Sequence, residues 1–368
     1  MTTTTQLNGR RFGDFQARSF LPVSGRLSAD VKWSQASSDD RHQAPPLHLA
    51  LWGDDLIVQY PERLESRPVA GGPVTWSQTV ASDFEFQLTD TGLTALGRAG
   101  VYTRYRKDGS AATTETLPLL ADIVRLHAME EIDGELRYAV ATEFIPSSDP
   151  GEMEEPPLMS FHRFDPVAMD YSWSFEAEDD LIQVLRHPRD DRWSLVGAAG
   201  IHAFASSTDD PAAVTTMKAD VIEAAAYDFD EQLLVVMIDQ GQRRLRCLDD
   251  AGATVWEDLL ANGALVQPPA SRPGQHHYLL LGDELSHWHQ GQLQWRYSVP
   301  FAGEHRPLFT VLEDGSILLT AGTHCIQLRS DGEELARVDT GGQLSCRPLM
   351  DAQGRVYLGS GPWIRCYQ

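Results

Sequence analysis

The chain is poor in positive charge. Its 368 residues include 30 Lys and Arg against 53 Asp and Glu, which gives a formal net charge of −23. Only Lys32, Lys107 and Lys218 are lysines. Because phosphate groups are bound by clustered Lys and Arg, this composition argues against a nucleic-acid partner and an anionic membrane surface. It favours solubility and protein partners with a basic surface.

The chain also lacks a hydrophobic run long enough to cross a bilayer, since the longest, 233–238, is far too short. The first residues show no basic segment followed by an apolar one, so we expect no secretory signal, no membrane insertion and a cytoplasmic location. No CxxC motif is present. We therefore expect the cysteines to be small buried strand residues and not metal ligands or disulfides. These are Cys247, Cys325, Cys346 and Cys366.

The most informative pattern is a repeat of about 41 residues in which a glycine precedes a short alternating run. A period of this length with short strands is typical of a β-propeller blade. The sequence therefore predicts an all-β protein that forms a single propeller. The marking glycines are spaced 41, 41, 40 and 39 residues apart, and they are Gly200, Gly241, Gly282, Gly322 and Gly361.

A strand centred on tryptophan recurs in phase with these glycines. Together with degenerate copies near 117, 216 and 337, the number of these strands predicts eight four-stranded blades. Seven blades are the alternative, because the third repeat is stretched. The last repeat has no such strand behind it, and the first has no glycine run ahead. The N-terminal strand should therefore complete the last blade and close the ring. The recurring tryptophans are Trp33, Trp76, Trp173, Trp256 and Trp295.

Two segments stand apart from the repeats, which occupy residues 29–368. Residues 1–28 form a predicted basic arm, in which Arg10, Arg11 and Arg18 are candidate partner-binding residues. Residues 146–157 form a Pro-rich acidic insertion in the third repeat. Such loops often bind partners, although a mobile terminus and a solvated loop remain the alternatives. Within the insertion the candidate partner-binding residues are Asp149, Glu152, Glu154 and Glu155.

The repeat pattern, which is clearest at 351–360, resembles the pyrroloquinoline-quinone-like (quinoprotein-type) β-propeller repeat. The resemblance is strongest over residues 176–368 and implies the fold. In that family the Trp strand docks blade to blade, so the five tryptophans are expected to be structural. The family contains quinone dehydrogenases, which often carry an adjacent cysteine pair, as well as cofactor-free scaffolds. This chain has no such pair, and with only Asn8 and Asn262 it shows no convincing calcium set. We expect no cofactor.

The densest group of histidines is His276, His277, His287 and His289. His287 and His289 are two residues apart on a predicted strand, so both should point to the same face. With His277 from the neighbouring strand they are weak candidates for a metal site, and surface histidines are the alternative. No phosphate-binding loop, zinc-protease motif or nucleophile elbow occurs, so no catalytic residue is predicted.

These observations favour a non-catalytic β-propeller scaffold for protein–protein interaction, as a subunit or regulator of a larger assembly. The first alternative is an enzyme or small-ligand-binding propeller with a metal or redox site in the central channel. The second is an envelope-assembly scaffold, which would need an export signal. The fold alone does not decide among them.

Overall fold

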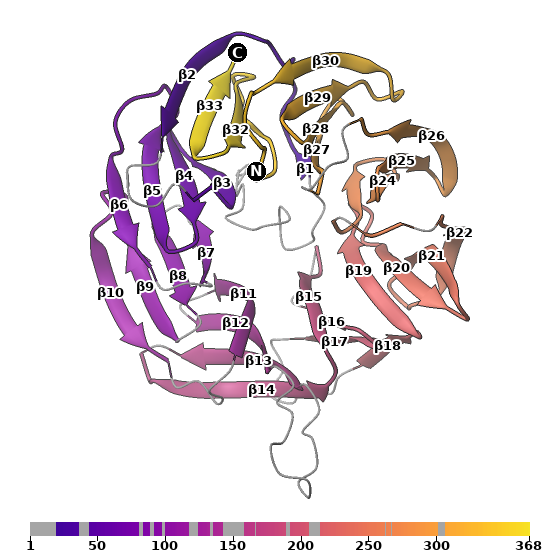
Figure 1. Cartoon of the computed structure of the whole chain (residues 1–368). Helices are drawn as coiled ribbons and strands as arrows, with labels where there is room; N and C mark the ends of the chain where they lie inside the picture. The colour runs from indigo at the N-terminus through magenta and orange to yellow at the C-terminus, as the bar shows by residue number, and fades with distance from the viewer. Residues whose placement is uncertain are drawn as a thin grey trace, which may run out of the picture.

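The computed structural model is an eight-bladed β-propeller, seen along the ring in Figure 1. It confirms the predicted all-β fold and excludes seven blades. Each blade is an antiparallel sheet of four strands, and blade 7 carries a fifth. The structure describes residues 20–36, 44–80, 84–88, 92–97, 100–117, 124–132, 135–142, 158–165, 167–188, 192–205, 214–261, 263–265, 267–300 and 306–368.

Blades 1 to 4 follow one another along the chain, each running from an inner to an outer strand. The insertion expected at 146–157 falls between the second and third strands of blade 3, outside the described residues. Their strands are β3 (His48–Trp52), β4 (Asp55–Tyr60), β5 (Arg63–Pro68), β6 (Trp76–Thr79); β7 (Phe84–Leu88), β8 (Leu93–Gly97), β9 (Val101–Tyr105), β10 (Ala111–Thr116); β11 (Val124–Ile132), β12 (Glu135–Thr142), β13 (Leu158–Asp165), β14 (Asp170–Glu178); β15 (Leu181–Arg186), β16 (Arg192–Gly197), β17 (Gly200–Ala205) and β18 (Val214–Lys218).

Blades 5 to 7 continue the pattern, and the predicted closure of the ring is confirmed in blade 8. The N-terminal strand β2 (Val31–Ala36) pairs antiparallel with the last strand of the chain and becomes the outer strand of that blade (Figure 1). The remaining strands are β19 (Val221–Tyr227), β20 (Leu233–Asp239), β21 (Gln242–Leu248), β22 (Thr254–Leu259); β23 (Ala270–Arg272), β24 (His276–Leu281), β25 (Glu284–His289), β26 (Gln292–Ser298); β27 (Leu308–Leu312), β28 (Ile317–Ala321), β29 (His324–Leu328), β30 (Glu334–Asp339); β31 (Leu349–Met350), β32 (Val356–Ser360) and β33 (Trp363–Tyr367).

The two faces of the ring differ in their connections. Because successive strands of a blade are antiparallel, the loops between blades lie on the same face as the turns between second and third strands. We call this the loop face. The turns between first and second strands, and between third and fourth strands, lie on the opposite face, which we call the turn face. The strands that flank the insertion, β12 and β13, end and begin on the loop face.

Residues 20–28, which the sequence placed in the basic arm, pack inside the ring. Strand β1 (Phe20–Leu21) pairs parallel with the inner strand β27 of blade 7. The side-chain amide of Gln327 then holds the next residues: its Nε2 donates to Gly25 O at 2.8 Å, and its Oε1 accepts from Leu27 N at 2.7 Å. This segment lies across the boundary between blades 7 and 8.

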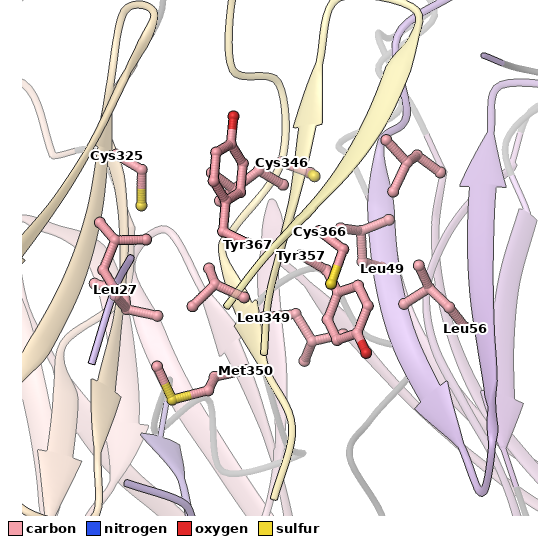
Figure 2. Close-up of a cluster of buried hydrophobic side chains, with 14 of the residues drawn as sticks. Leu27, Leu49, Leu56, Cys325, Cys346, Leu349, Met350, Tyr357, Cys366 and Tyr367 are labelled. Atoms are coloured by element: carbon pink, nitrogen blue, oxygen red, sulfur yellow. The ribbon is translucent and has the colours of Figure 1, made fainter. Parts of the chain in front are cut away.

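The hydrophobic core is a series of clusters between neighbouring blades. The cluster at the ring closure joins residues of blades 7, 8 and 1 with Leu27 from the N-terminal segment (Figure 2). Alternation along each strand sends one set of side chains to the blade before and the other set to the blade after, so every blade is buried on both faces. Among the described residues no helix has the length and apolar character to cross a membrane.

Candidate functional site

Four tryptophans of the outer strands, Trp33, Trp76, Trp256 and Trp295, contact the next blade. The indole Nε1–H of Trp33 donates to Val69 O at 3.2 Å, that of Trp76 donates to Lys107 O at 3.0 Å, and that of Trp295 donates to Ser330 O at 2.9 Å. All three acceptors belong to turns between the third and fourth strands of the following blade. Trp173 lies on β14, paired with Arg163 in the register of the sheet.

Glycine at these turns lets the indole approach closely. A Cβ built on Gly71 would lie 2.6 Å from Trp33 Cδ1, and one on Gly291 would lie 2.7 Å from Trp256 Cγ. Both glycines also have positive φ, which side-chain-bearing residues rarely adopt. The Trp strand and the glycine turn are therefore two halves of one contact between blades.

A glutamine two residues after the tryptophan strengthens two of these contacts. Gln35 Nε2 donates to Gly72 O at 2.5 Å, and Gln78 Nε2 donates to Gly109 O at 2.7 Å. Sequence reasoning missed this role, although residues 31–35 (VKWSQ) and 74–78 (VTWSQ) are nearly the same pentapeptide, with Trp and Gln at matching positions. The same spacing of Trp and Gln on one strand face places both side chains over the same turn.

The histidine group is divided between two faces of blade 6. The register of β24 and β25 pairs His276 with His289 and Tyr278 with His287, whereas His277 pairs with Trp288. Since paired residues share a face, His277 points toward blade 5, where its Nε2 lies 3.9 Å from Asp228 Oδ2. The structure therefore does not bring His277 together with His287 and His289.

The other three histidines form a stack toward blade 7, and sequence reasoning missed His276 as its central member. His276 Nδ1 lies 3.0 Å from His287 Nε2 with ring planes 17° apart, so one imidazole N–H donates to the other. The ring of His289 stacks on His276 at 4.4 Å between centroids. Burial lowers the pKa of His276 to about 4 and that of His287 to about 3. Both rings are thus neutral at pH 7.

Neutral imidazoles can bind metal ions, but the arrangement around them does not complete a ligand set. Within the described part of the chain, no group of three or more His, Cys, Asp or Glu side chains is placed to hold a metal ion. The cysteines do not contribute, because all four are free and buried. Burial raises the pKa of Cys247 and Cys325 to about 12, which keeps these thiols protonated.

A serine–histidine pair occurs in blade 3, but it is buried. His162 Nε2 lies 3.0 Å from Ser160 Oγ, and its Nδ1 lies 2.8 Å from Ser174 Oγ. His162 is 2% exposed, and burial lowers its pKa to about 4. A nucleophile must reach its substrate and its base must accept a proton near neutral pH. This pair therefore serves as a hydrogen-bonded link within the sheet.

A buried charge cluster lies where the ring closes. Glu65 is fully buried on β5, 2.6 Å from Arg67 and 2.9 Å from Arg63. The Arg67 guanidinium also donates to Gln35 Oε1 at 3.2 Å and to Ala36 O at 2.7 Å. It therefore connects blade 1 with the closing strand β2. The alternation Arg-x-Glu-x-Arg at 63–67 was a readable signal, because residues two apart on a strand share a face.

The loop face carries exposed carboxylates around blades 4 to 7. No ion pair is found for Asp180, Asp220 or Asp283 within the described residues. Two arginines of this face are in ion pairs, Arg243 with Glu223 at 2.7 Å and Arg296 with Glu284 at 3.4 Å. This face therefore presents exposed carboxylates that have no ion pair among the described residues, together with the exposed Lys218.

The candidate partner-binding residues of the arm and the insertion lie outside the described residues. Their flanking strands still fix where each segment leaves the ring. β1 runs parallel to β27, whose first residue lies at the loop face, and β12 and β13 also end and begin there. Both segments are therefore attached at the loop face. The segments themselves comprise Arg10, Arg11 and Arg18 in the arm, and Asp149, Glu152, Glu154 and Glu155 in the insertion.

The sequence matches no protein-family model and no curated protein. Solved structures do match in shape. BamB from Moraxella catarrhalis is 13% identical with a TM-score of 0.61, covering 92% of this chain and 99% of its own. A quinohemoprotein alcohol dehydrogenase from Pseudomonas putida HK5 is 10% identical with a TM-score of 0.64, covering 96% and 78%. Saccharomyces cerevisiae Sqt1 is 8% identical with a TM-score of 0.62, covering 90% and 97%.

These identities show the fold alone. Because BamB and the alcohol dehydrogenase are both quinoprotein-type propellers, the likeness supports the quinoprotein-like propeller fold that the repeat pattern predicted. One of these neighbours is an enzyme by name, so the shared fold does not decide between a scaffold and a catalyst.

Proposed function

We propose that the chain is a non-catalytic β-propeller scaffold that binds a protein partner with a basic surface, as a subunit or regulator of a larger assembly. The observation that carries this proposal is the unpaired negative charge of the loop face, represented by Asp180, Asp220 and Asp283. A rigid disc with exposed carboxylates that lack an ion pair attracts a partner of opposite charge and orients it before contact.

The groups that might carry chemistry are used inside the fold, which also supports a scaffold. The stacked histidines bond to each other, and the serine–histidine pair is enclosed between blades. All four cysteines are unpaired and buried, which suits a reducing compartment such as the cytoplasm. The arm and the insertion leave the ring at the loop face and are the proposed flanking contacts.

Charge reversal on the loop face tests the proposal. We would purify the protein that co-purifies with the native chain, and compare its association rate with wild type and with Asp180→Lys/Asp283→Lys. The matched control is Asp54→Lys/Glu313→Lys, which makes the same change in net charge at two exposed positions of the turn face. Neither pair has a side-chain hydrogen bond or ion pair within the described residues, so the fold should tolerate both variants.

We expect the loop-face variant to slow association roughly tenfold at low salt, and the control to slow it much less, because steering acts through the local field. Equal effects of the two variants would show that only net charge matters. A chain that purifies without any protein, but with a stoichiometric metal or quinone, would overturn the scaffold and favour a site in the channel.

A further inference from the structure

Blade 3 lacks a contact that joins four of the other blades to the blade before them. In blades 1, 2, 6 and 7, the turn between third and fourth strands holds a glycine beneath a tryptophan of the preceding blade. The corresponding turn of blade 3, between β13 and β14, carries Val167 and Met169 instead. The outer strand that precedes it, β10, contains no tryptophan. Among the described residues, the preceding blade therefore provides no indole to cover this turn.

The two apolar side chains of this turn point into solvent. Val167 is 91% exposed, the highest value for a large hydrophobic residue in the described part of the chain, and Met169 is 47% exposed. Isolated exposed apolar residues are common on protein surfaces. Here, however, two of them stand at the tip of one hairpin, at a position where blades 1, 2, 6 and 7 have a glycine covered by tryptophan.

The turn is held in a fixed shape. Asp165 Oδ1 accepts hydrogen bonds from Val167 N at 2.8 Å and from Ala168 N at 3.1 Å. Met169 has a φ of 54°, in the left-handed region that residues with a side chain seldom occupy. A preformed turn loses little conformational entropy on binding, so its side chains can act as an anchor.

We propose that the turn at Val167 and Met169 is an anchor that inserts into an apolar pocket of a protein partner, and that the rim of this pocket is basic. The inference rests on the proposed function and adds a second contact, on the turn face. Charge argues for the basic rim: Asp165 and Asp170 flank the apolar tip, and the whole chain has a net charge of −23. A disc with contacts on both faces would join two proteins.

Site-specific photocrosslinking identifies the partner. A benzophenone amino acid replaces Val167 in the full chain, expressed in its native cells. The matched position is Val255, which is 50% exposed on the outer strand β22 of blade 5. A protein that cross-links at 167 and not at 255 is purified. It is then titrated against wild type, Val167→Asp/Met169→Asn and Val255→Asp. Asn is chosen because it tolerates left-handed backbone.

We expect Val167→Asp/Met169→Asn to weaken binding roughly tenfold or more, as for a buried apolar anchor, and Val255→Asp to leave it unchanged. Binding should also weaken as salt rises, because the rim contacts are exposed charges. Equal cross-linking at the two positions, or an affinity unchanged in the double variant, overturns the anchor. Either result leaves the proposed scaffold function unaffected if a protein still binds the loop face. A chain that binds no protein overturns both.

Discussion

The substitution Glu65→Ala leaves the buried guanidinium of Arg67 without the carboxylate that it meets at 2.6 Å. The Arg67 side chain is 2% exposed and the Glu65 side chain is fully buried, so water cannot replace the lost partner. Breaking a buried ion pair by removing one member costs about 3–5 kcal/mol. Arg63 is less affected, because its side chain is 13% exposed and its guanidinium lies over the Tyr60 ring at 4.7 Å.

The matched control is Glu257→Ala on the outer strand of blade 5. Glu257 also bridges two arginines, Arg244 at 2.8 Å and Arg246 at 3.1 Å, but its side chain is 39% exposed. Exposed pairs contribute about 0–1 kcal/mol, so the two variants should differ by several-fold in their effect. The double variant Glu65→Leu/Arg67→Met should recover much of the loss, because no uncompensated charge remains.

The assay is urea unfolding followed by tryptophan fluorescence, combined with hydrogen exchange of the β2 amides. Arg67 donates to Ala36 O, so we expect the loss to appear first as faster exchange across Val31–Ala36. A loss of about 4 kcal/mol corresponds to a roughly thousandfold rise in opening of that strand. If Glu65→Ala were no more harmful than Glu257→Ala, the reasoning from burial would be refuted.

Three further results are expected. Burial lowers the pKa of His162 to about 4 and of His277 to about 3, both below the value of about 6.5 for an exposed histidine. The unfolded chain therefore binds more protons than the folded chain below about pH 6.5, and each of the two histidines should lower the free energy of unfolding by about 2 kcal/mol at pH 5. His277→Leu should flatten the measured dependence of stability on pH. Gly291→Ala should lower the free energy of unfolding in urea by about 2–5 kcal/mol. The control is Gly241→Ala, which has a similar φ but no atom within 4 Å of the added Cβ, and it should cost about 1–2 kcal/mol. Equal losses would show that the contact with the indole does not matter for stability. Gln327→Ala should speed limited proteolysis of residues 20–27 without changing cleavage elsewhere, and an unchanged rate would show that β1 holds the segment alone.

The sequence was sufficient for the architecture because each blade repeats a local pattern. Glycine turns, alternating strands and a central tryptophan are short-range signals, and their count predicts eight blades and the closure by β2. The pairing of Phe20–Leu21 with β27 was missed, since two residues of parallel pairing have no periodicity. Its partner lies roughly 290 residues away in the chain, so only the folded ring brings them together.

The candidate site was less predictable because it depends on register. The spacing of His287 and His289 places both on one face, but whether His276 or His277 joins them depends on how β24 pairs with β25. A shift of one residue exchanges the two faces of a strand, and the sequence does not fix that shift. The exposed turn at Val167 was missed for a different reason. The sequence shows that the strand before blade 3 lacks tryptophan, but only the structure shows that Val167 is left 91% exposed.

The closing strand also has a consequence for biosynthesis. Strand β2 leaves the ribosome roughly 330 residues before its partner β33, which at about 5–20 residues per second is a wait of about 15–70 s. Over that time the edge of β2 that will pair with β33 has no partner and is open to aggregation. The contacts of Trp33 with Val69 O and of Gln35 with Gly72 O need only blade 1, which is made immediately afterwards. The nascent strand β2 can therefore dock on blade 1 until blade 8 has been synthesised.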